Sequence, residues 1–271
     1  INTLKKEFSN ASFFYLCAHE NHFNFSLKEF NCKIDTLDLK MKYFGFRWWH
    51  MFAVRNNIKK LNVDKFDLII DLQSKVRNTL ILKKIPHIFF VSPTFNFKLS
   101  KPFLNFNKSH SINNDILKAI NKIFKTNFKL IEYDIKKIDK KLSIEAEKLL
   151  PNKNYVGFSI TQGNVYRKKG WPMSHIIDVC KKFKERNKIP VFFIEKNNIN
   201  LKNKIINLIP EALIPEHESK LSSPALVSCL GKRLDFAISI DNGIMHMLSL
   251  SKTPMIVLFG PTSSEKFAPS Y

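Results

Sequence analysis

Short apolar runs alternate with longer amphipathic segments along most of this chain. In the first half the runs are SFFYL from Ser12, FDLIIDL from Phe66 and HIFFV from His87, and a helix-like VRNTLILKK stands between the last two. Parallel strands need long crossover connections, usually helices, so this alternation favours βαβ units. The pattern therefore predicts a parallel α/β sheet in this half.

A second series of the same kind begins at Tyr155. Five strand signals follow one another: YVGFSI, PVFFI, EALI, DFAISI and PMIVLF. Helical patterns separate them over residues 174–186 and 197–208, near 222–230, and from Gly243 onward. This half therefore predicts a second doubly wound sheet.

The length and one turn-rich segment suggest two domains. A chain of 271 residues can hold two domains of ordinary size. The residues Pro151-Asn152-Lys153-Asn154 favour a turn or linker. We therefore predict an N-terminal domain over residues 1–150 and a C-terminal domain over residues 151–271.

Composition and the first residues of the chain limit the cellular compartment that can be expected. No apolar run approaches the roughly 20 residues that a membrane-spanning helix needs, and the four cysteines form no C-x-x-C pair, so a soluble or peripheral protein of a reducing cytoplasm is expected. The chain begins with Ile1, and its opening INTLKKEF resembles neither a signal peptide nor a transit sequence. We therefore expect a fragment of a longer protein.

The formal charge of +21 raises the question of an anionic partner. Basic residues are scattered and are mostly Lys, whereas proteins that read bases favour Arg. The most basic stretch is Lys98 to Lys141, with eleven Lys against four acidic residues. A solvated face is the ordinary explanation of such a stretch, and an anion-binding surface is the alternative.

The segment DFAISIDNGIMHMLSL carries the clearest candidate site. The expected strand Phe236 to Ile240 delivers Asp241 at its carboxyl end, then Asn242 and Gly243 form a turn, and His246 lies in the first turn of a helix. Ligands of open α/β sheets bind at this edge, where helix N-termini favour phosphate. The alternative is a plain helix cap beside an ordinary histidine.

Two other strand ends carry polar groups. After YVGFSI come Thr161 and Gln162, the basic run Arg167-Lys168-Lys169, and Trp171-Pro172 before a helix. Mobile lysines can close over a diphosphate, although a solvated loop explains them equally well. After FDLII come Asp71, Gln73, and a helix start with Lys75 and Arg77. Cations are unfavourable at a helix N-terminus, so they weakly indicate a nearby anion.

In their order and spacing these three segments resemble glycosyltransferase family 9, the heptosyltransferases of the lipopolysaccharide inner core. The similar features are Asp-Leu-Gln and a basic helix start at Asp71 to Arg77, Lys169 two residues before Trp171-Pro172, and Asp241-Asn242-Gly243-Ile244-Met245-His246 followed by IVLF and Gly260-Pro261-Thr262. The likeness covers nearly the whole chain and is strongest from residue 155 onward. Asn242 stands where the family usually has Thr.

The resemblance implies an α/β fold of GT-B type, with two Rossmann-like doubly wound domains facing a cleft. It implies a nucleotide-sugar donor, in this family mostly ADP-heptose, held by the second domain. Ser159, Thr161 and Lys169 would hold the diphosphate, Glu195 the ribose, and Asp241, Asn242, Gly243 and His246 the sugar and phosphates. Gln73, Lys75 and Arg77 would lie on the acceptor side.

The resemblance also implies an inverting transfer that needs no metal or other cofactor. The acceptor would be a lipid-linked core oligosaccharide at the anionic inner face of the cytoplasmic membrane, and nucleic acid would not be a partner. The family's presumed catalytic base belongs to a strand and loop that we expect before Ile1, so no base is assigned. Further helices are likewise expected after the last residues, which end nine positions beyond Thr262.

Two other functions remain open at this point. One is a non-catalytic module of the same fold that binds a nucleotide or nucleotide sugar without turnover. The other is a basic nucleic-acid binder, whose affinity would fall steeply with salt and would not respond to ADP.

Overall fold

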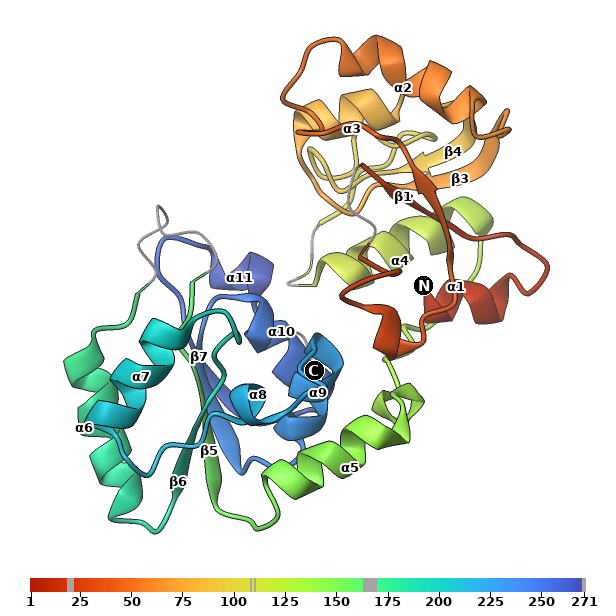
Figure 1. Ribbon diagram of the computed structural model, residues 1–271. Coiled ribbons are helices and arrows are strands. Elements are labelled where there is room, and N and C mark those ends of the chain that lie inside the picture. Colours follow the sequence, from red (N-terminus) through yellow and green to blue (C-terminus); the bar gives the residue numbers. More distant parts are fainter. Residues whose placement is uncertain (19–21, 108, 110, 163–169, 270–271) are drawn as a thin grey trace. The chain divides into compact units, whose positions relative to one another are not determined.

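The chain folds into two compact units. The computed structural model describes residues 1–18, 22–107, 109, 111–162 and 170–269 (Figure 1). Unit 1 comprises Ile1–Phe25 and Lys33–Glu132, and unit 2 comprises Ser26–Cys32 and Tyr133–Tyr271. Among the helices of the described ranges, none is both long and apolar enough to cross a bilayer.

Unit 2 is built on one parallel sheet of four strands in the order β6-β5-β7-β8. The strands are β5 (Tyr155–Ser159), β6 (Ile189–Phe192), β7 (Phe236–Ile240) and β8 (Met255–Leu258). The run EALI, expected as a fifth strand, contributes a single parallel bridge from Leu213 to Val191 beside β6. From β5 the chain passes to β6 on one side, then crosses back to β7 and β8 on the other side of β5. This reversal of strand order confirms the predicted doubly wound sheet.

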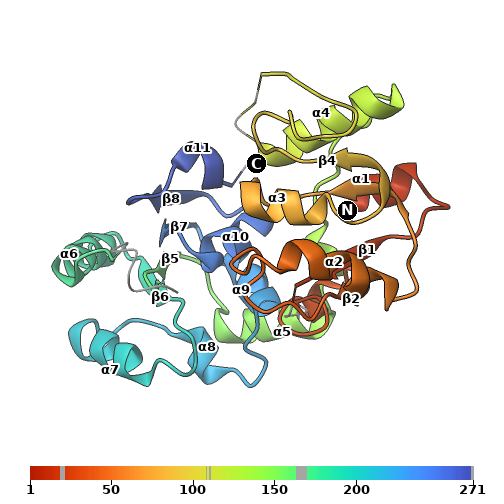
Figure 2. The same cartoon turned by 90° about the horizontal axis from the view of Figure 1, so that it is seen from above.

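Helices cover both faces of this sheet (Figure 2). One face packs on α6 (Met173–Lys184) and α7 (Ile199–Leu208), and the other on α5 (Lys140–Leu149), α9 (Pro224–Gly231) and α10 (Gly243–Leu250). Successive residues of β6 and its extension enter alternate cores, because strand side chains point to opposite faces. The remaining short elements are η2 (Ile135–Lys137), α8 (Pro215–Glu218) and α11 (Ser264–Phe267).

Unit 1 has two parallel strand pairs. The pairs are β1 (Phe14–Cys17) with β2 (Asp35–Asp38), and β3 (Phe66–Ile70) with β4 (His87–Val91). One face of β3 and β4 packs on α2 (His50–Lys59) and α3 (Val76–Leu82), and the other on α1 (Asn2–Glu7) and α4 (Ile112–Phe124). The strand β2 was not expected, since its sequence DTLD carries two carboxylates and only one large apolar residue.

The division between the units lies earlier than the domain boundary expected at residue 150. The helix α5 packs on α9, with Leu142 and Leu150 in the same core as Leu226. The segment Ser26–Cys32, with its short helix η1 (Lys28–Phe30), also belongs to unit 2. Pro151–Asn154 is therefore the turn between α5 and β5 inside unit 2, and no linker.

Candidate functional site

Asn242 joins three parts of unit 2 at the carboxyl edge of its sheet. Its Nδ2 donates to Ser159 Oγ (2.7 Å) and to the Thr161 carbonyl oxygen (2.9 Å), beyond the end of β5. Its Oδ1 accepts the backbone N–H of Met245 (3.1 Å) and so caps α10. One side chain thus fixes the end of β5, the turn after β7 and the start of a helix.

Asp241 makes the corresponding link toward β8. Its carboxylate is largely buried and accepts a hydrogen bond from Thr262 Oγ1 at 2.5 Å, in the loop that follows β8. The segment that begins at Asp241 and the Gly260-Pro261-Thr262 segment therefore meet at one edge of the sheet. Asp241 is thereby committed to holding that loop.

The start of α10 leaves room for a ligand. A Cβ built on Gly243 would have no atom within 4 Å, so the described part of the chain leaves the space over this backbone open. Backbone N–H groups at a helix N-terminus and the helix dipole favour an anion there. His246 lies one turn further, exposed on the same helix. Desolvation by surrounding protein lowers the pKa of its imidazole, against the opposing effect of Asp241, so the neutral form prevails at pH 7.

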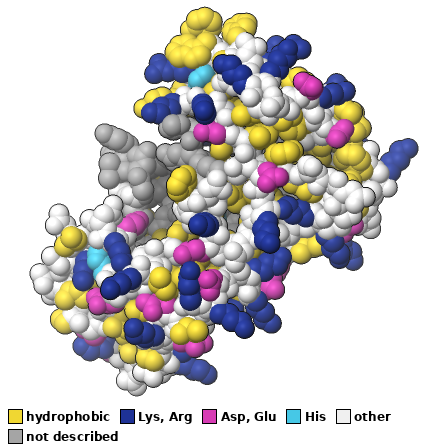
Figure 3. Space-filling view, turned by 45° about the vertical axis from the view of Figure 1, so that its right-hand side comes forward, with side chains coloured by type: hydrophobic (Ala, Val, Ile, Leu, Met, Phe, Trp, Pro, Cys, Tyr) yellow, Lys and Arg dark blue, Asp and Glu magenta, His cyan; other side chains and the backbone are white. Residues whose placement is uncertain are grey.

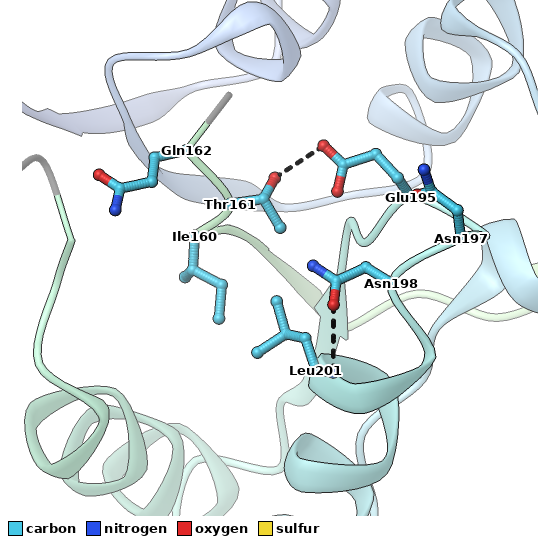
Figure 4. Close-up of a pocket in the computed structure, with 7 residues that line it drawn as sticks. All are labelled: Ile160, Thr161, Gln162, Glu195, Asn197, Asn198 and Leu201. Atoms are coloured by element: carbon cyan, nitrogen blue, oxygen red, sulfur yellow. Dashed lines mark hydrogen bonds between the residues drawn. The ribbon is translucent and has the colours of Figure 1, made fainter. Parts of the chain in front are cut away.

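A pocket of about 600 Å³ lies beside this edge, between the ends of β5 and β6 (Figure 4). Thr161 Oγ1 donates to Glu195 Oε1 across it at 3.1 Å. Asn198 caps α7 on the far wall by accepting the Leu201 N–H. The lining residues are Ile160, Thr161, Gln162, Glu195, Asn197, Asn198 and Leu201.

The structure brings together five of the predicted features at this edge of the sheet: Ser159, Thr161, Glu195, Asn242 and the start of α10. Ser159 is fully buried and its hydroxyl is engaged by Asn242, so it positions Asn242 and has no open path to a phosphate. The predicted site residue Lys169 belongs to residues 163–169, which lie outside the described part of the chain.

Glu216 was not singled out in the sequence, yet its environment is the most unusual of the described carboxyl groups. It lies in α8 with only 6% of its surface exposed, and its Oε2 has no hydrogen-bond partner among the described residues. Burial, together with the nearby charge of Glu195, raises its pKa to about 7, although the Ile194 N–H opposes this. Its only sequence signal is its place just after the apolar run EALI.

In unit 1 a buried carboxylate, Asp71, holds the turn that carries the predicted acceptor-side residue Gln73. Asp71, 1% exposed at the end of β3, accepts from Thr79 Oγ1 (2.5 Å) and Ser92 Oγ (2.9 Å) and from the Gln73 N–H (2.9 Å). Gln73 Oε1 in turn accepts from Asn78 Nδ2. This network fixes the turn that presents the exposed Gln73.

The two basic residues of this turn are also exposed. The helix α3 begins at Val76, so Lys75 is its N-cap residue. Arg77 lies in the first turn, with its guanidinium carbon 3.5 Å from the centre of the Phe46 ring. Both cations therefore stand at the carboxyl edge of the unit 1 strands.

The model of glycosyltransferase family 9 (heptosyltransferase) matches residues 54–271, which is most of the chain. This chain belongs to glycosyltransferase family 9. It is therefore a glycosyltransferase of the heptosyltransferase type, and the match includes all three segments on which the resemblance was based.

Solved structures show the same fold at low sequence identity. A family 9 glycosyltransferase from Veillonella parvula has a TM-score of 0.68 and 16% identity, covering 99% of this chain and 78% of its own. E. coli heptosyltransferase WaaC with ADP has a TM-score of 0.63 and 14% identity, and the match covers 98% of this chain and 83% of WaaC. E. coli ADP-heptose lipopolysaccharide heptosyltransferase II has a TM-score of 0.61 and 14% identity, and the match covers 99% of this chain and 81% of that enzyme. No curated protein sequence matches significantly. The fold is thus of the GT-B type.

The bridging role of Asn242 in this family 9 enzyme can be measured. Asn242→Ala removes a helix cap worth about 1 kcal/mol and two further bonds, so the free energy of unfolding of unit 2 should fall by about 2 kcal/mol. Asn198→Ala is the matched control, because Asn198 caps α7 and makes no cross-strand bond in the described network. Urea denaturation that gives equal losses for both variants would show that the bridge contributes nothing.

Proposed function

We propose that this family 9 enzyme transfers a heptose-like sugar from a nucleotide diphosphate donor, ADP-heptose, to a lipopolysaccharide core acceptor. The observation that carries the proposal is the junction at Asn242, where the ends of β5 and β7 meet at a helix N-terminus beside the Glu195 pocket. Nucleotides bind open α/β sheets at such an edge. The similar WaaC structures hold ADP and ADP-2-deoxy-2-fluoro heptose.

The roles follow from the chemistry of each group. In this proposal Lys169 and the start of α10 at Gly243 neutralise the leaving diphosphate. Thr161 lines the pocket beside them, with its hydroxyl donating to Glu195. Glu195 accepts hydrogen bonds from ribose hydroxyls. His246, neutral at pH 7, contacts the sugar or its phosphate, while Asp241 and Ser159 hold the surrounding loops.

The reaction inverts the anomeric carbon. The acceptor hydroxyl attacks that carbon, a carboxylate base takes its proton, and the bond to the diphosphate breaks with its electrons. We assign no base, because Asp71 and Asp241 are both engaged in hydrogen bonds that hold the fold. The proposed transfer uses no metal, since cationic side chains and backbone N–H groups supply the stabilisation.

The proposed acceptor places the enzyme at the inner face of the cytoplasmic membrane. A core oligosaccharide is anionic and lipid-linked, and the chain carries a formal charge of +21. In unit 1 the exposed Gln73, Lys75 and Arg77 are the groups proposed to meet it. Anionic surfaces attract such clusters of cations within a Debye length.

The purified protein tests this function with ADP-heptose and core acceptor, by release of ADP and the mass of the product. Lys169→Ala and His246→Ala should each lower kcat/KM and ADP affinity about tenfold or more, the cost of one lost charge-assisted or polar contact. Lys153→Ala is the control, because Lys153 is an exposed lysine at the opposite, amino edge of β5.

The outcomes separate the possible functions. Unchanged kinetics in both site variants would contradict the site assignment. ADP binding without turnover of any acceptor would favour a non-catalytic binding module. Salt-sensitive binding of RNA or DNA that ADP does not affect would favour a nucleic-acid binder.

A further inference from the structure

Five large aromatic side chains stand exposed together in unit 1. Tyr43, Phe46, Trp48, Trp49 and Phe52, here called the aromatic patch, come from ten consecutive residues at the start of α2 and the loop before it. Trp48 and Phe52 are 75% and 72% exposed. Hydrophobic side chains bordered by Lys and Arg are visible at the top of Figure 3. Contiguous exposed apolar surface of this kind marks an interaction site.

Buried residues beneath the patch hold it in shape. His50 is almost fully buried, accepts the Gly45 N–H at its Nδ1 and stacks on Phe44. Val54 and Ile58 anchor the inner face of α2 in the core of unit 1. The aromatic side chains therefore point outward from a fixed frame, which reduces the entropy cost of binding through them.

The charged residues that neighbour the patch in the sequence are all of one sign. Between Leu39 and Val63 the sequence has six cations and no Asp or Glu. The six are exposed, namely Lys40, Lys42, Arg47, Arg55, Lys59 and Lys60. The guanidinium of Arg47 lies over the rings of Tyr43 (5.9 Å) and Trp49 (5.5 Å). Cations and aromatic rings are thus interleaved on one surface.

We infer that the aromatic patch docks this enzyme onto the headgroup region of an anionic lipid bilayer. Trp and Tyr favour the membrane interface because one end of each ring system is apolar and the other polar. Surrounding Lys and Arg add attraction to anionic headgroups. The core of a protein interface is instead depleted of charge, which makes a protein partner the poorer match.

The stretch Lys98–Lys141, the most basic of the sequence, fits this role less well. It is divided between the two units, and Lys118 and Lys141 lie within 4 Å of Asp115 and Asp139. It carries no comparable group of exposed aromatic residues in its described part. The inference deepens the proposed function and rests on it for a lipid-linked acceptor, but its test needs neither donor nor acceptor.

The test is co-sedimentation of the purified protein with vesicles of phosphatidylcholine alone or mixed with phosphatidylglycerol. We expect binding to the anionic vesicles, weakened by salt and absent with neutral ones. Trp48→Ala/Phe52→Ala should lower the partition coefficient at least tenfold without changing thermal stability, because both side chains are exposed. Lys122→Ala/Lys129→Ala, a change of two exposed lysines in the Lys98–Lys141 stretch, should alter it less than threefold.

Other outcomes overturn the inference. It is wrong if the aromatic variant binds vesicles as well as the original chain does, or if the original chain binds none. It is also wrong if the patch mediates a dimer that the variant loses in analytical ultracentrifugation. Transfer to a deacylated, water-soluble acceptor should be unchanged in the variant; an equal loss there would assign the patch to the acceptor saccharide. Vesicle binding without any sugar transfer would remove the proposed function and leave this inference standing.

Discussion

Asp71→Ala should lower the free energy of unfolding of unit 1 by about 3 kcal/mol, since hydrogen bonds to a buried carboxylate are among the strongest side-chain contacts. The change removes the acceptor of Thr79, Ser92 and the Gln73 N–H at one stroke. It also leaves two buried hydroxyl groups to find other partners. Urea denaturation followed by circular dichroism measures the loss.

Asp67→Ala is the control for Asp71→Ala. Asp67 lies in the same strand, β3, but is exposed, so its loss should change stability by less than about 0.5 kcal/mol. Asp71→Asn should fall between the two, because the amide keeps the shape and one acceptor oxygen. If Asp71→Ala were as stable as the control, the buried network would not be what fixes the turn at Gln73.

A second large effect is expected from Glu216→Gln, and it depends on pH. The pKa of this carboxyl is raised from about 4.5 to about 7, mainly by burial. The native state therefore holds a proton that the unfolded state releases above pH 4.5. Stability from this group is complete below pH 4.5 and falls as the pH rises to about 7, by about 3 kcal/mol at 1.36 kcal/mol per pKa unit.

Glu216→Gln should remove this dependence. At pH 8 the variant should be more stable than the original chain by up to about 3 kcal/mol, and at pH 4.5 it should have no advantage. Glu218→Gln on the same helix is the control, because Glu218 is exposed and its ion pair with Lys202 is worth little. A Glu216→Gln variant with the same pH profile as the original chain would show that Glu216 titrates normally.

The architecture of unit 2 was accessible from sequence because its strands are continuous apolar runs. PVFFI and DFAISI are buried on both faces, so their composition alone separates them from the amphipathic helices. The motif residues after β5 and β7 were placed at one edge for the same reason, since parallel strands bring their carboxyl ends together. The family model then confirmed the resemblance that those residues carried.

The features that the sequence did not predict correctly also have physical causes. The run EALI has the composition of a strand, but only Leu213 pairs, because the chain turns at Pro215 into α8. Three of the four residues of β2 are polar, and the strand lies at a sheet edge, so its sequence shows no apolar periodicity. The unusual state of Glu216 depends on desolvation and on Glu195, which is 21 positions away, and a local pattern carries no information about either.

The excursion of Ser26–Cys32 gives the two units an interleaved connectivity. The chain crosses between them three times, after Phe25, after Cys32 and after Glu132. Phe30 sits in the core of unit 2 and its carbonyl oxygen accepts a hydrogen bond from Tyr133 at 2.7 Å. A protease cut between Glu132 and Tyr133 would therefore leave residues 1–132 and 133–271 still associated, because Phe30 of the first piece is buried in the core of unit 2. Residues 133–271 expressed alone would also lack part of unit 2, because the segment Ser26–Cys32, which places Phe30 in its core, lies about a hundred residues earlier in the sequence.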